Sequence, residues 1–220
     1  MSRARLAAGV VAAAPVRPTV RLKARLAALG QPYVVAADAG AATALSFGLR
    51  PDVVIGDLDS IDDATLARLK AENVTFETFP RDKDATDGQL AVQRALEAEP
   101  AELILLGFLG GPRLDQAVAN VLLLIRINVP VSVLDEHNAC LLLRPGEERT
   151  WRPEAGEIVS LIPLERSAEG VRTRGLRWAL NGERLELGDT RGISNEPANA
   201  AEVSVSLQRG LLLITRHFPD

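Results

Sequence analysis

The sequence predicts an α/β N-terminal domain with a mostly parallel sheet, followed by a smaller all-β sandwich domain. Up to about residue 137, short apolar runs alternate with amphipathic stretches, which is typical of strands covered by helices. Beyond that point the apolar runs continue, but no convincing amphipathic helix separates them. Val203, Val205 and Leu207 alternate there with serines, as in a half-buried strand. We therefore expect domains at residues 1–138 and 139–220, with a boundary between 136 and 144.

The expected elements follow from this periodicity and from the turn residues that interrupt it. Glycines end the first two helices, at Gly30 and Gly48. Strands are expected at residues 9–14, 33–37, 53–55, 74–79, 103–107 and 131–134, and helices at 18–29, 41–47, 62–71, 84–97 and 115–127. In the second part, apolar runs cover residues 140–143, 157–162, 183–187, 202–207 and 211–215. Asn181 and Gly182 predict a hairpin turn between two of its strands.

Composition narrows the class of protein. Of the 220 residues, 47% are hydrophobic and 25% are charged, which is ordinary globular composition with enough apolar surface for a core. The net charge of −4 offers no basic surface for nucleic acid, and no run approaches the roughly 20 apolar residues that a membrane span needs. Cys140 is the single cysteine, so an intrachain disulfide is excluded and a reducing cytoplasm is the expected compartment. We expect the N-terminal apolar run to form a buried strand rather than a signal peptide.

A first acidic cluster follows the strand expected at 53–55, in the segment 51–60 (PDVVIGDLDS). If the backbone stays extended, Asp57 and Asp59 project to the same side at the carboxyl end of that strand, where ligands bind in open α/β sheets. Two close carboxylates repel each other unless a cation lies between them. Mg²⁺ prefers such carboxylates together with substrate phosphate oxygens. A solvated turn that caps the next helix is the alternative reading.

A second cluster, residues 81–87 (RDKDATD), lies just before an expected helix. Asp84 suits the N-cap of that helix, and Asp87 three residues later resembles a capping box. Capping leaves Asp82 and Lys83 unexplained, and a lysine among carboxylates is a plausible phosphate partner.

A third cluster follows the buried strand at 103–107, where a glycine-rich loop opens a helix. Backbone N–H groups around Gly110 can hold phosphate, and Arg113 can add a bidentate contact. Asp115 can cap the helix instead, because glycine loops after strands are often only turns. Together the three clusters predict a magnesium-nucleotide site for phosphoryl transfer.

Four segments in this order, together with two from the second half, resemble the thiamine pyrophosphokinase family. They are residues 38–40 (DAG), 51–60, 82–87 and 110–116 (GGPRLDQ), followed by 175–178 (GLRW) and 192–196 (GISNE). The resemblance spans about residues 33 to 215. It implies transfer of a pyrophosphoryl group from ATP to thiamine, giving thiamine diphosphate and AMP. It also implies Mg²⁺ and a homodimer with thiamine bound between subunits.

The resemblance further implies a role for each matching residue. Asp57, Asp59 and Asp87 would hold the metal, and Asp84 and Asp115 would join them in the catalytic group. The nucleotide would be bound by Asp38, Lys83, Gly110, Arg113 and Gln116. Trp178 would stack on the thiamine rings, with Ser194 and Asn195 in the same pocket.

This chain departs from the family pattern at three places. Residues 12–15 read AAAP where family members usually have Asn-Gly at the end of the first strand. Gln116 stands where bacterial members often carry histidine, and Ala39 with Gly40 keeps the usual small pair only loosely. Every expected carboxylate is nevertheless present. Two rival functions stay open at this stage: a related diphosphokinase acting on another primary alcohol such as 6-hydroxymethylpterin, and a non-catalytic nucleotide sensor.

Overall fold

The computed structural model describes residues 6–80, 82, 84–199 and 201–219, and the chain divides into two compact units, residues 1–136 and 137–220. Among the described residues, no helix is both long and apolar enough to cross a membrane. Lys83, which the sequence places in the nucleotide site, lies outside the described residues.

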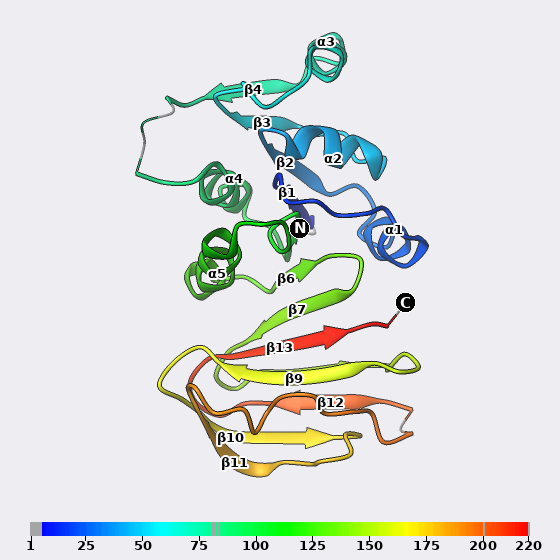
Figure 1. Ribbon diagram of the computed structural model, residues 1–220, viewed down its shortest axis with the longest axis vertical. Helices are drawn as coiled ribbons and strands as arrows, with labels where there is room; N and C mark the ends of the chain where they lie inside the picture. Colours follow the sequence, from blue (N-terminus) through cyan, green and yellow to red (C-terminus); the bar gives the residue numbers. More distant parts are fainter. Residues whose placement is uncertain (1–5, 81, 83, 200, 220) are drawn as a thin grey trace, which may run out of the picture. The chain divides into compact units, whose positions relative to one another are not determined.

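The described part of the first unit contributes six parallel strands to a sheet, with helices on both faces of these strands (Figure 1). Its strands are β1 (Ala8–Val11), β2 (Tyr33–Ala37), β3 (Val53–Gly56), β4 (Thr75–Thr78), β5 (Leu103–Leu106) and β6 (Val131–Leu134). The helices are α1 (Val20–Ala27), α2 (Gly40–Ser46), α3 (Asp63–Ala71), α4 (Asp87–Leu96), α5 (Leu114–Leu123) and the 3₁₀ turn η1 (Leu124–Arg126). The strand order is β4-β3-β2-β1-β5-β6, and all pairings are parallel. This confirms the predicted α/β class.

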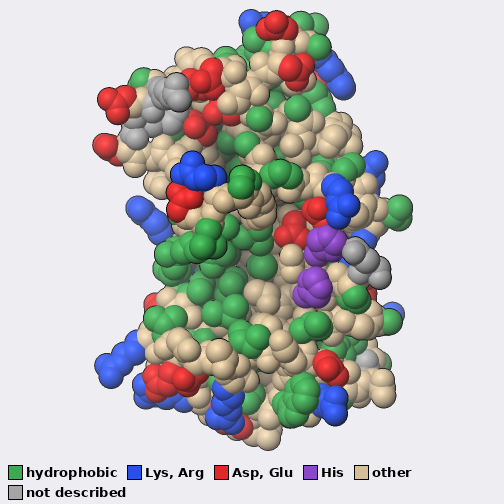
Figure 2. Space-filling view, in the orientation of Figure 1, with side chains coloured by type: hydrophobic (Ala, Val, Ile, Leu, Met, Phe, Trp, Pro, Cys, Tyr) green, Lys and Arg blue, Asp and Glu red, His purple; other side chains and the backbone are tan. Residues whose placement is uncertain are grey.

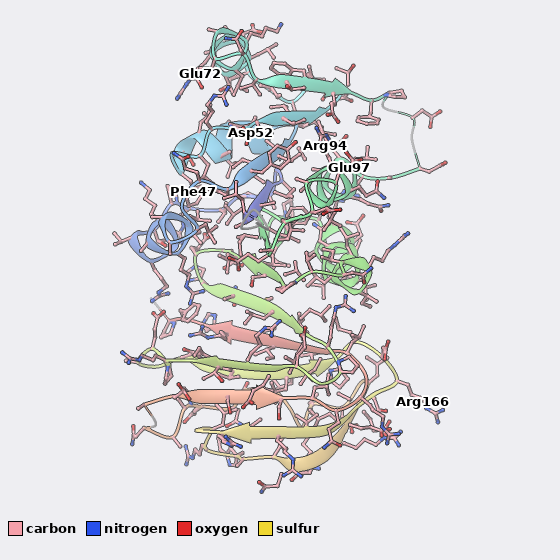
Figure 3. The ribbon with its side chains drawn as sticks, turned by 180° about the vertical axis from the view of Figure 1, so that it is seen from behind. Phe47, Asp52, Glu72, Arg94, Glu97 and Arg166 are labelled. Atoms are coloured by element: carbon pink, nitrogen blue, oxygen red, sulfur yellow. The ribbon has the colours of Figure 1, made fainter. Side chains whose placement is uncertain are left out.

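Apolar strands form the centre of this unit because both faces of its sheet are covered. β1, β3 and β5 are buried along their whole length, as expected for parallel strands between two helical layers. Figure 1 shows α4 and α5 on one face and α1 and α2 on the other. On the first of these faces lies the Arg94 side chain of α4, labelled in Figure 3. It donates to Glu77 of β4 at 2.7 Å and lies 5.8 Å from the centre of the Tyr33 ring.

The second unit is a sandwich of two antiparallel sheets. One layer contains the neighbouring strands β7-β13-β9, and the other is a sheet with the order β11-β10-β12-β8. The strands are β7 (Asn138–Leu143), β8 (Glu148–Trp151), β9 (Ile158–Pro163), β10 (Ser167–Arg174), β11 (Asn181–Glu186), β12 (Val203–Ser206) and β13 (Leu212–His217). Apolar side chains from both sheets share one core, which includes Val159, Val171, Val205 and Ile214. The predicted β-sandwich is thus confirmed.

Two local predictions in this unit were wrong or incomplete. Asn181 and Gly182 do not form a two-residue hairpin turn but begin β11, where the pairing with β10 shifts register near Val171 and Arg172. Gly182 has a φ of 105°, a conformation that glycine adopts without strain at such a bulge. The strands β8 and β10 were not anticipated, because they carry few apolar side chains.

Candidate nucleotide and metal site

The first unit has one natural position for a ligand. β1 lies in the middle of the sheet; the chain runs outward through β2, β3 and β4 and then returns to β5 on the other side of β1. The direction of winding therefore reverses between β1 and β5. In open α/β sheets, ligands bind outside the carboxyl ends of the strands at such a reversal.

A cavity of about 350 Å³ lies at this position. The residues that follow β1, β2 and β5 line it together with the first residues of α4 and α5. Among the residues predicted from the sequence, it includes Asp38, Asp87, Gly110, Arg113 and Gln116. Residues 12–14, predicted as the end of the first strand, leave the sheet after Val11 and form one wall together with Pro15.

The glycine-rich loop after β5 is shaped by close backbone contact with the end of β1. Gly107 has a φ of 67°, and a Cβ atom there would lie 2.3 Å from the carbonyl oxygen of Ala12, so no larger residue fits. The side-chain amide of Asn120 donates to the carbonyl oxygen of Phe108 at 2.8 Å. Gly110 and Gly111 also have positive φ. The first residues of the loop are thus held in place beside the cavity.

An acidic pocket of about 530 Å³ adjoins the first cavity. It shares Asp38, Asp87 and Gln116 with that cavity. The aspartates that line it are Asp38, Asp57, Asp59, Asp84 and Asp87. The carboxylates from the first two sequence clusters therefore meet at one end of one sheet, as predicted.

Asp57 and Asp59 reach this pocket by a turn, and the prediction of an extended backbone was wrong. β3 ends at Gly56, and Leu58 between the two aspartates has a φ of 66°, in the left-handed region. The N–H of Leu58 donates to Oδ1 of Asp38 at 3.1 Å, and the N–H of Asp59 donates to Oδ1 of Asp57 at 3.3 Å. The free-energy cost of the left-handed conformation of Leu58 is offset by these two hydrogen bonds, which also orient the carboxylates of Asp38 and Asp57.

Gly56 allows the Asp38 carboxylate to cross the end of β3. A Cβ atom at Gly56 would lie 1.8 Å from Oδ1 of Asp38, and Gly56 itself has a φ of 145°. Asp38 also has a positive φ, 43°. The glycine before the Asp-x-Asp pair is therefore part of the site, because only its missing side chain leaves room for Asp38.

The N-terminus of α4 differs from the prediction in a way that bears on Asp84. Thr86 is the N-cap, and its Oγ1 accepts from the N–H of Gln89 at 3.2 Å. Asp84 is therefore not the cap, so helix capping does not account for it. Asp87 is the first helical residue, where the helix dipole favours a negative charge.

The acidic pocket suits a cation that completes its coordination with ligand oxygens. Its donors are carboxylate oxygens, the ligands that Mg²⁺ prefers, and Oδ1 of Asp87 is shielded from solvent. Within the described part of the chain, no three Asp, Glu, His or Cys residues stand close enough to enclose a metal ion by themselves. Mg²⁺ usually takes only one or two carboxylates together with water and phosphate oxygens, so the donor set fits this ion.

Arg113 and Asp115 form an ion pair at the start of α5. Nε of Arg113 donates to Oδ1 of Asp115 at 2.8 Å, and Nη2 donates to Oδ2 at 2.6 Å. These bonds lower the pKa of Asp115 to about 2 and raise that of Arg113. Arg113 lines the first cavity, but Asp115 lines neither cavity in this conformation.

The second unit carries its own cavity, of about 430 Å³. Trp178, Ser194 and Asn195, predicted to contact the thiamine rings, all line it, together with Arg191. The Trp178 side chain is exposed, whereas Asn195 is buried. The three residues are therefore brought together within this unit.

Two family models match the chain in succession. The catalytic domain of thiamin pyrophosphokinase matches residues 26–133, and the vitamin B1 binding domain of thiamin pyrophosphokinase matches residues 148–212. The chain belongs to the thiamine pyrophosphokinase family. The resemblance seen in the sequence motifs is thereby confirmed.

Relatives of known sequence and structure agree with this membership. The chain is 29% identical over 185 residues to the thiamine pyrophosphokinase of Bacillus subtilis, covering 83% of this chain and 86% of the relative. The crystal structure of the Bacillus subtilis thiamine pyrophosphokinase matches with a TM-score of 0.85 at 26% identity, covering 97% of this chain and all of that one. The thiamin pyrophosphokinase of Geobacillus thermodenitrificans matches with a TM-score of 0.82 at 27% identity, over 98% of this chain and 99% of that one.

Four residues of this thiamine pyrophosphokinase fold were not singled out from the sequence. Thr86 lines both the 350 Å³ cavity and the acidic pocket of the first unit. Asn120 lines the 350 Å³ cavity and binds the glycine-rich loop through the carbonyl oxygen of Phe108. Asn120 lies four residues after Gln116 on α5, and this helical spacing could have revealed it. Phe108 and Arg191 carried no comparable signal, because a buried aromatic residue and a surface arginine are common in any fold.

Proposed function

We propose that this chain transfers the pyrophosphoryl group of ATP to the hydroxyethyl oxygen of thiamine, giving thiamine diphosphate and AMP. The observation that carries the proposal is the group of aspartates beside the glycine-rich loop, at the winding reversal of the parallel sheet. Family models for a catalytic and a vitamin B1 binding domain match the two halves of the same chain. In the reaction, the thiamine hydroxyl oxygen bonds to the β-phosphorus of ATP and its proton is released to solvent. The bond from that phosphorus to the oxygen of the α-phosphate breaks, and AMP leaves with that oxygen.

The nucleotide lies in the cavity between β1 and β5. The loop around Gly110 and the N-termini of α4 and α5 direct N–H groups toward its phosphates, and Arg113 supplies a guanidinium for a phosphate oxygen. Asp38 and Gln116 line the same cavity and orient the nucleotide. Lys83 adds a second cation by family resemblance.

Mg²⁺ is the metal that we propose for the acidic pocket. Family resemblance assigns the ion to Asp57, Asp59 and Asp87, with Asp84 beside them. These described carboxylates do not enclose an ion by themselves, so one or two of them would bind it directly together with water and phosphate oxygens. Bound there, the ion would neutralise phosphate charge, which lowers the repulsion that a hydroxyl group meets at the β-phosphorus. Asp115 orients the reacting groups once Arg113 turns toward a phosphate.

Thiamine is the acceptor that the second unit favours. Its thiazolium is a cation, and an exposed indole such as that of Trp178 attracts cations by roughly 0.5 to 2 kcal/mol. Ser194 and Asn195 line the same cavity. A pterin alcohol carries no such cation, and a nucleotide sensor would not require a vitamin B1 binding domain, so both rivals fit less well.

We further propose a cytoplasmic homodimer. A reducing compartment with ATP suits a chain whose single cysteine is a buried thiol. Support for the dimer comes from α5, where Leu114, Val118 and Leu122 form one row and are 76%, 50% and 51% exposed. Figure 2 shows hydrophobic side chains gathered over this helix. Exposed apolar patches of this kind mark interaction sites, and a second copy of the chain is the partner that family resemblance implies.

The proposal is tested by incubating the protein with ATP, Mg²⁺ and thiamine and separating the nucleotides. AMP and thiamine diphosphate in equal amounts are expected. Release of ADP would instead show an ordinary kinase that transfers one phosphate. Turnover with 6-hydroxymethylpterin but not with thiamine would establish the rival acceptor.

A further inference from the structure

Asn195 uses its side chain to hold the backbone of Trp178. Its Oδ1 accepts from the N–H of Trp178 at 3.1 Å, and its Nδ2 donates to the carbonyl oxygen of Trp178 at 2.8 Å. The same Oδ1 accepts from the N–H of Glu196 at 2.9 Å. Asn195 is only 8% exposed, so these bonds are largely screened from water. One buried amide thus binds both polar backbone atoms of a residue 17 positions away.

The orientation of this amide follows from its partners. If oxygen and nitrogen were exchanged, the NH₂ group would face two N–H donors, and the oxygen would face a carbonyl oxygen. An amide has two acceptor positions and two donors, and three of these four are occupied here. At most one N–H of Asn195 is left to bind a ligand, so most of its hydrogen-bonding groups serve the protein backbone and not a substrate.

The result is an exposed ring on a fixed backbone. The Trp178 side chain is 54% exposed and borders the cavity of the second unit. Next to it, the N–H of Arg177 donates to the carbonyl oxygen of Glu196 at 2.8 Å, and Leu176 pairs with Pro197. The Arg177 guanidinium lies 4.8 Å from the centre of the Trp178 ring. Fixing a binding surface before the ligand arrives reduces the entropy lost on binding.

We propose that Asn195 is a positioning residue of the thiamine site, which acts through Trp178 and not by contact with the substrate. The inference rests on the proposed function in one respect, namely that thiamine binds against Trp178. It changes the role that family resemblance suggested for Asn195, from a substrate contact to a support for the aromatic surface.

The first test replaces Asn195 by aspartate, which keeps the shape and both accepted bonds. The bond to the carbonyl oxygen of Trp178 then becomes a repulsion between two oxygens. We expect the Kd for thiamine, measured by calorimetry with Mg²⁺ and a non-hydrolysable ATP analogue, to rise about 10-fold. The KM for ATP should stay within about twofold, because the nucleotide site lies in the other unit. An unchanged thiamine Kd would overturn the proposal.

A double-mutant cycle separates positioning from direct contact. Trp178→Ala alone should weaken thiamine binding, and Asn195→Asp added to it should cause no further loss, because the residue that Asn195 supports is gone. If Asn195→Asp costs the same factor with and without Trp178, Asn195 binds thiamine directly and the proposal fails. If Trp178→Ala leaves thiamine binding unchanged, the proposed thiamine site and this inference fail together. Thiamine binding without turnover would remove only the proposed reaction.

Matched controls address charge and folding. Asn199→Asp places the same charge on an exposed residue of the same segment, and it should leave the thiamine Kd unchanged. Asn195→Ala serves as a second variant without charge, with thermal melting to compare the folded fractions. In the unaltered protein, the amide hydrogen of Trp178 should exchange with solvent much more slowly than that of a solvent-bonded amide. Fast exchange there would overturn the proposal without any variant.

Discussion

Arg113 and Asp115 bind each other through two parallel hydrogen bonds at the first turn of α5. Both side chains are about two-thirds exposed, at 67% and 65%. The arginine predicted to bind phosphate is therefore engaged by a carboxylate in this structure. A phosphate that drew Arg113 away would release Asp115 at the same moment, which would couple the two predicted roles.

This pairing predicts the titration of Asp115. The two bonds from Arg113 lower its pKa from 3.8 to about 2. The contribution of the ion pair to the stability of the folded state is therefore complete above about pH 4 and is lost as the pH falls through about 2. Carboxyl chemical shifts measured by NMR should show this low pKa, and Arg113→Gln should return it to the ordinary range.

An internal control is available for this titration. The pKa of Asp62 is lowered by hydrogen bonds from Thr65, and Arg113→Gln should not affect it. Equal pKa values of Asp115 in the two proteins would show that the ion pair does not form in solution.

The metal assignment predicts loss of turnover from Asp57→Asn and from Asp59→Asn. Each change removes a charge from the acidic pocket but keeps the shape of the side chain. We expect AMP formation to fall by roughly 100-fold or more, with little change in melting temperature. Asp63→Asn, at an exposed position on α3 that lines neither cavity, is the matched control and should retain activity. Near-normal rates from both site variants would refute the assignment.

Gly56 gives a test of geometry without a change of charge. In Gly56→Ala, the new methyl group would meet the Asp38 carboxylate, 1.8 Å away, and Asp38 must move. Misplacement of a site group by about 1 Å can cost about 100-fold in rate, and we expect a loss of that order. Gly48→Ala is the control, since Gly48 also has a positive φ, 75°, but nothing lies within 4 Å of the added atom. If both variants lose activity equally, backbone strain and not the contact with Asp38 is responsible.

How far the sequence predicted this site depended on which interactions were local. The alternation of strands and helices predicted that residues after β3 and β5 would meet at one edge, and they do. The turn at Leu58 was missed because its left-handed conformation is stabilised by Asp38, twenty residues earlier in the chain. The N-cap of α4 is Thr86 instead of Asp84, two residues later than expected, a shift that local patterns rarely resolve.

The β-sandwich was harder to read for a physical reason. β10 (Ser167–Arg174) buries only part of its length and carries charged residues on its other face. Its partners β11 and β12 come from later in the chain, so its place in the sheet is set by pairing and not by its own composition. The role of Asn195 was hidden in the same way, because both bonds to Trp178 span 17 residues.

The proposed dimer predicts that charged substitutions in the exposed apolar row of α5 separate the two subunits. Val118→Lys together with Leu122→Lys places two charges in the exposed apolar row, and we expect light scattering after gel filtration to show monomers. Val20→Lys on α1, where the original side chain is 87% exposed, is the control and should leave the dimer intact. A monomeric parent protein, or a dimeric double variant, would rule out this face as the interface.

The buried ion pair of the second unit predicts a large loss of stability. Arg216 binds Glu157 through Nε at 2.6 Å and Nη2 at 2.8 Å, and the two residues are 8% and 1% exposed. Trp151 donates a further bond to Glu157. In Arg216→Met, an apolar stem still fits between the rings of Trp151 and Phe218, but Glu157 is left as a buried charge without its cation. The expected cost is about 3–5 kcal/mol in the free energy of unfolding.

Tryptophan fluorescence during denaturation measures the free energy of unfolding of the second unit, because Trp151 and Trp178 both lie in that unit. Arg177→Met breaks the exposed pair with Glu196 and is the matched control, for which about 0.2–1 kcal/mol is expected. The two expected losses differ because water can solvate the exposed carboxylate of Glu196 but not the buried carboxylate of Glu157. Similar losses from the two variants would mean that Glu157 becomes hydrated, and that the sandwich core opens more readily than its packing indicates.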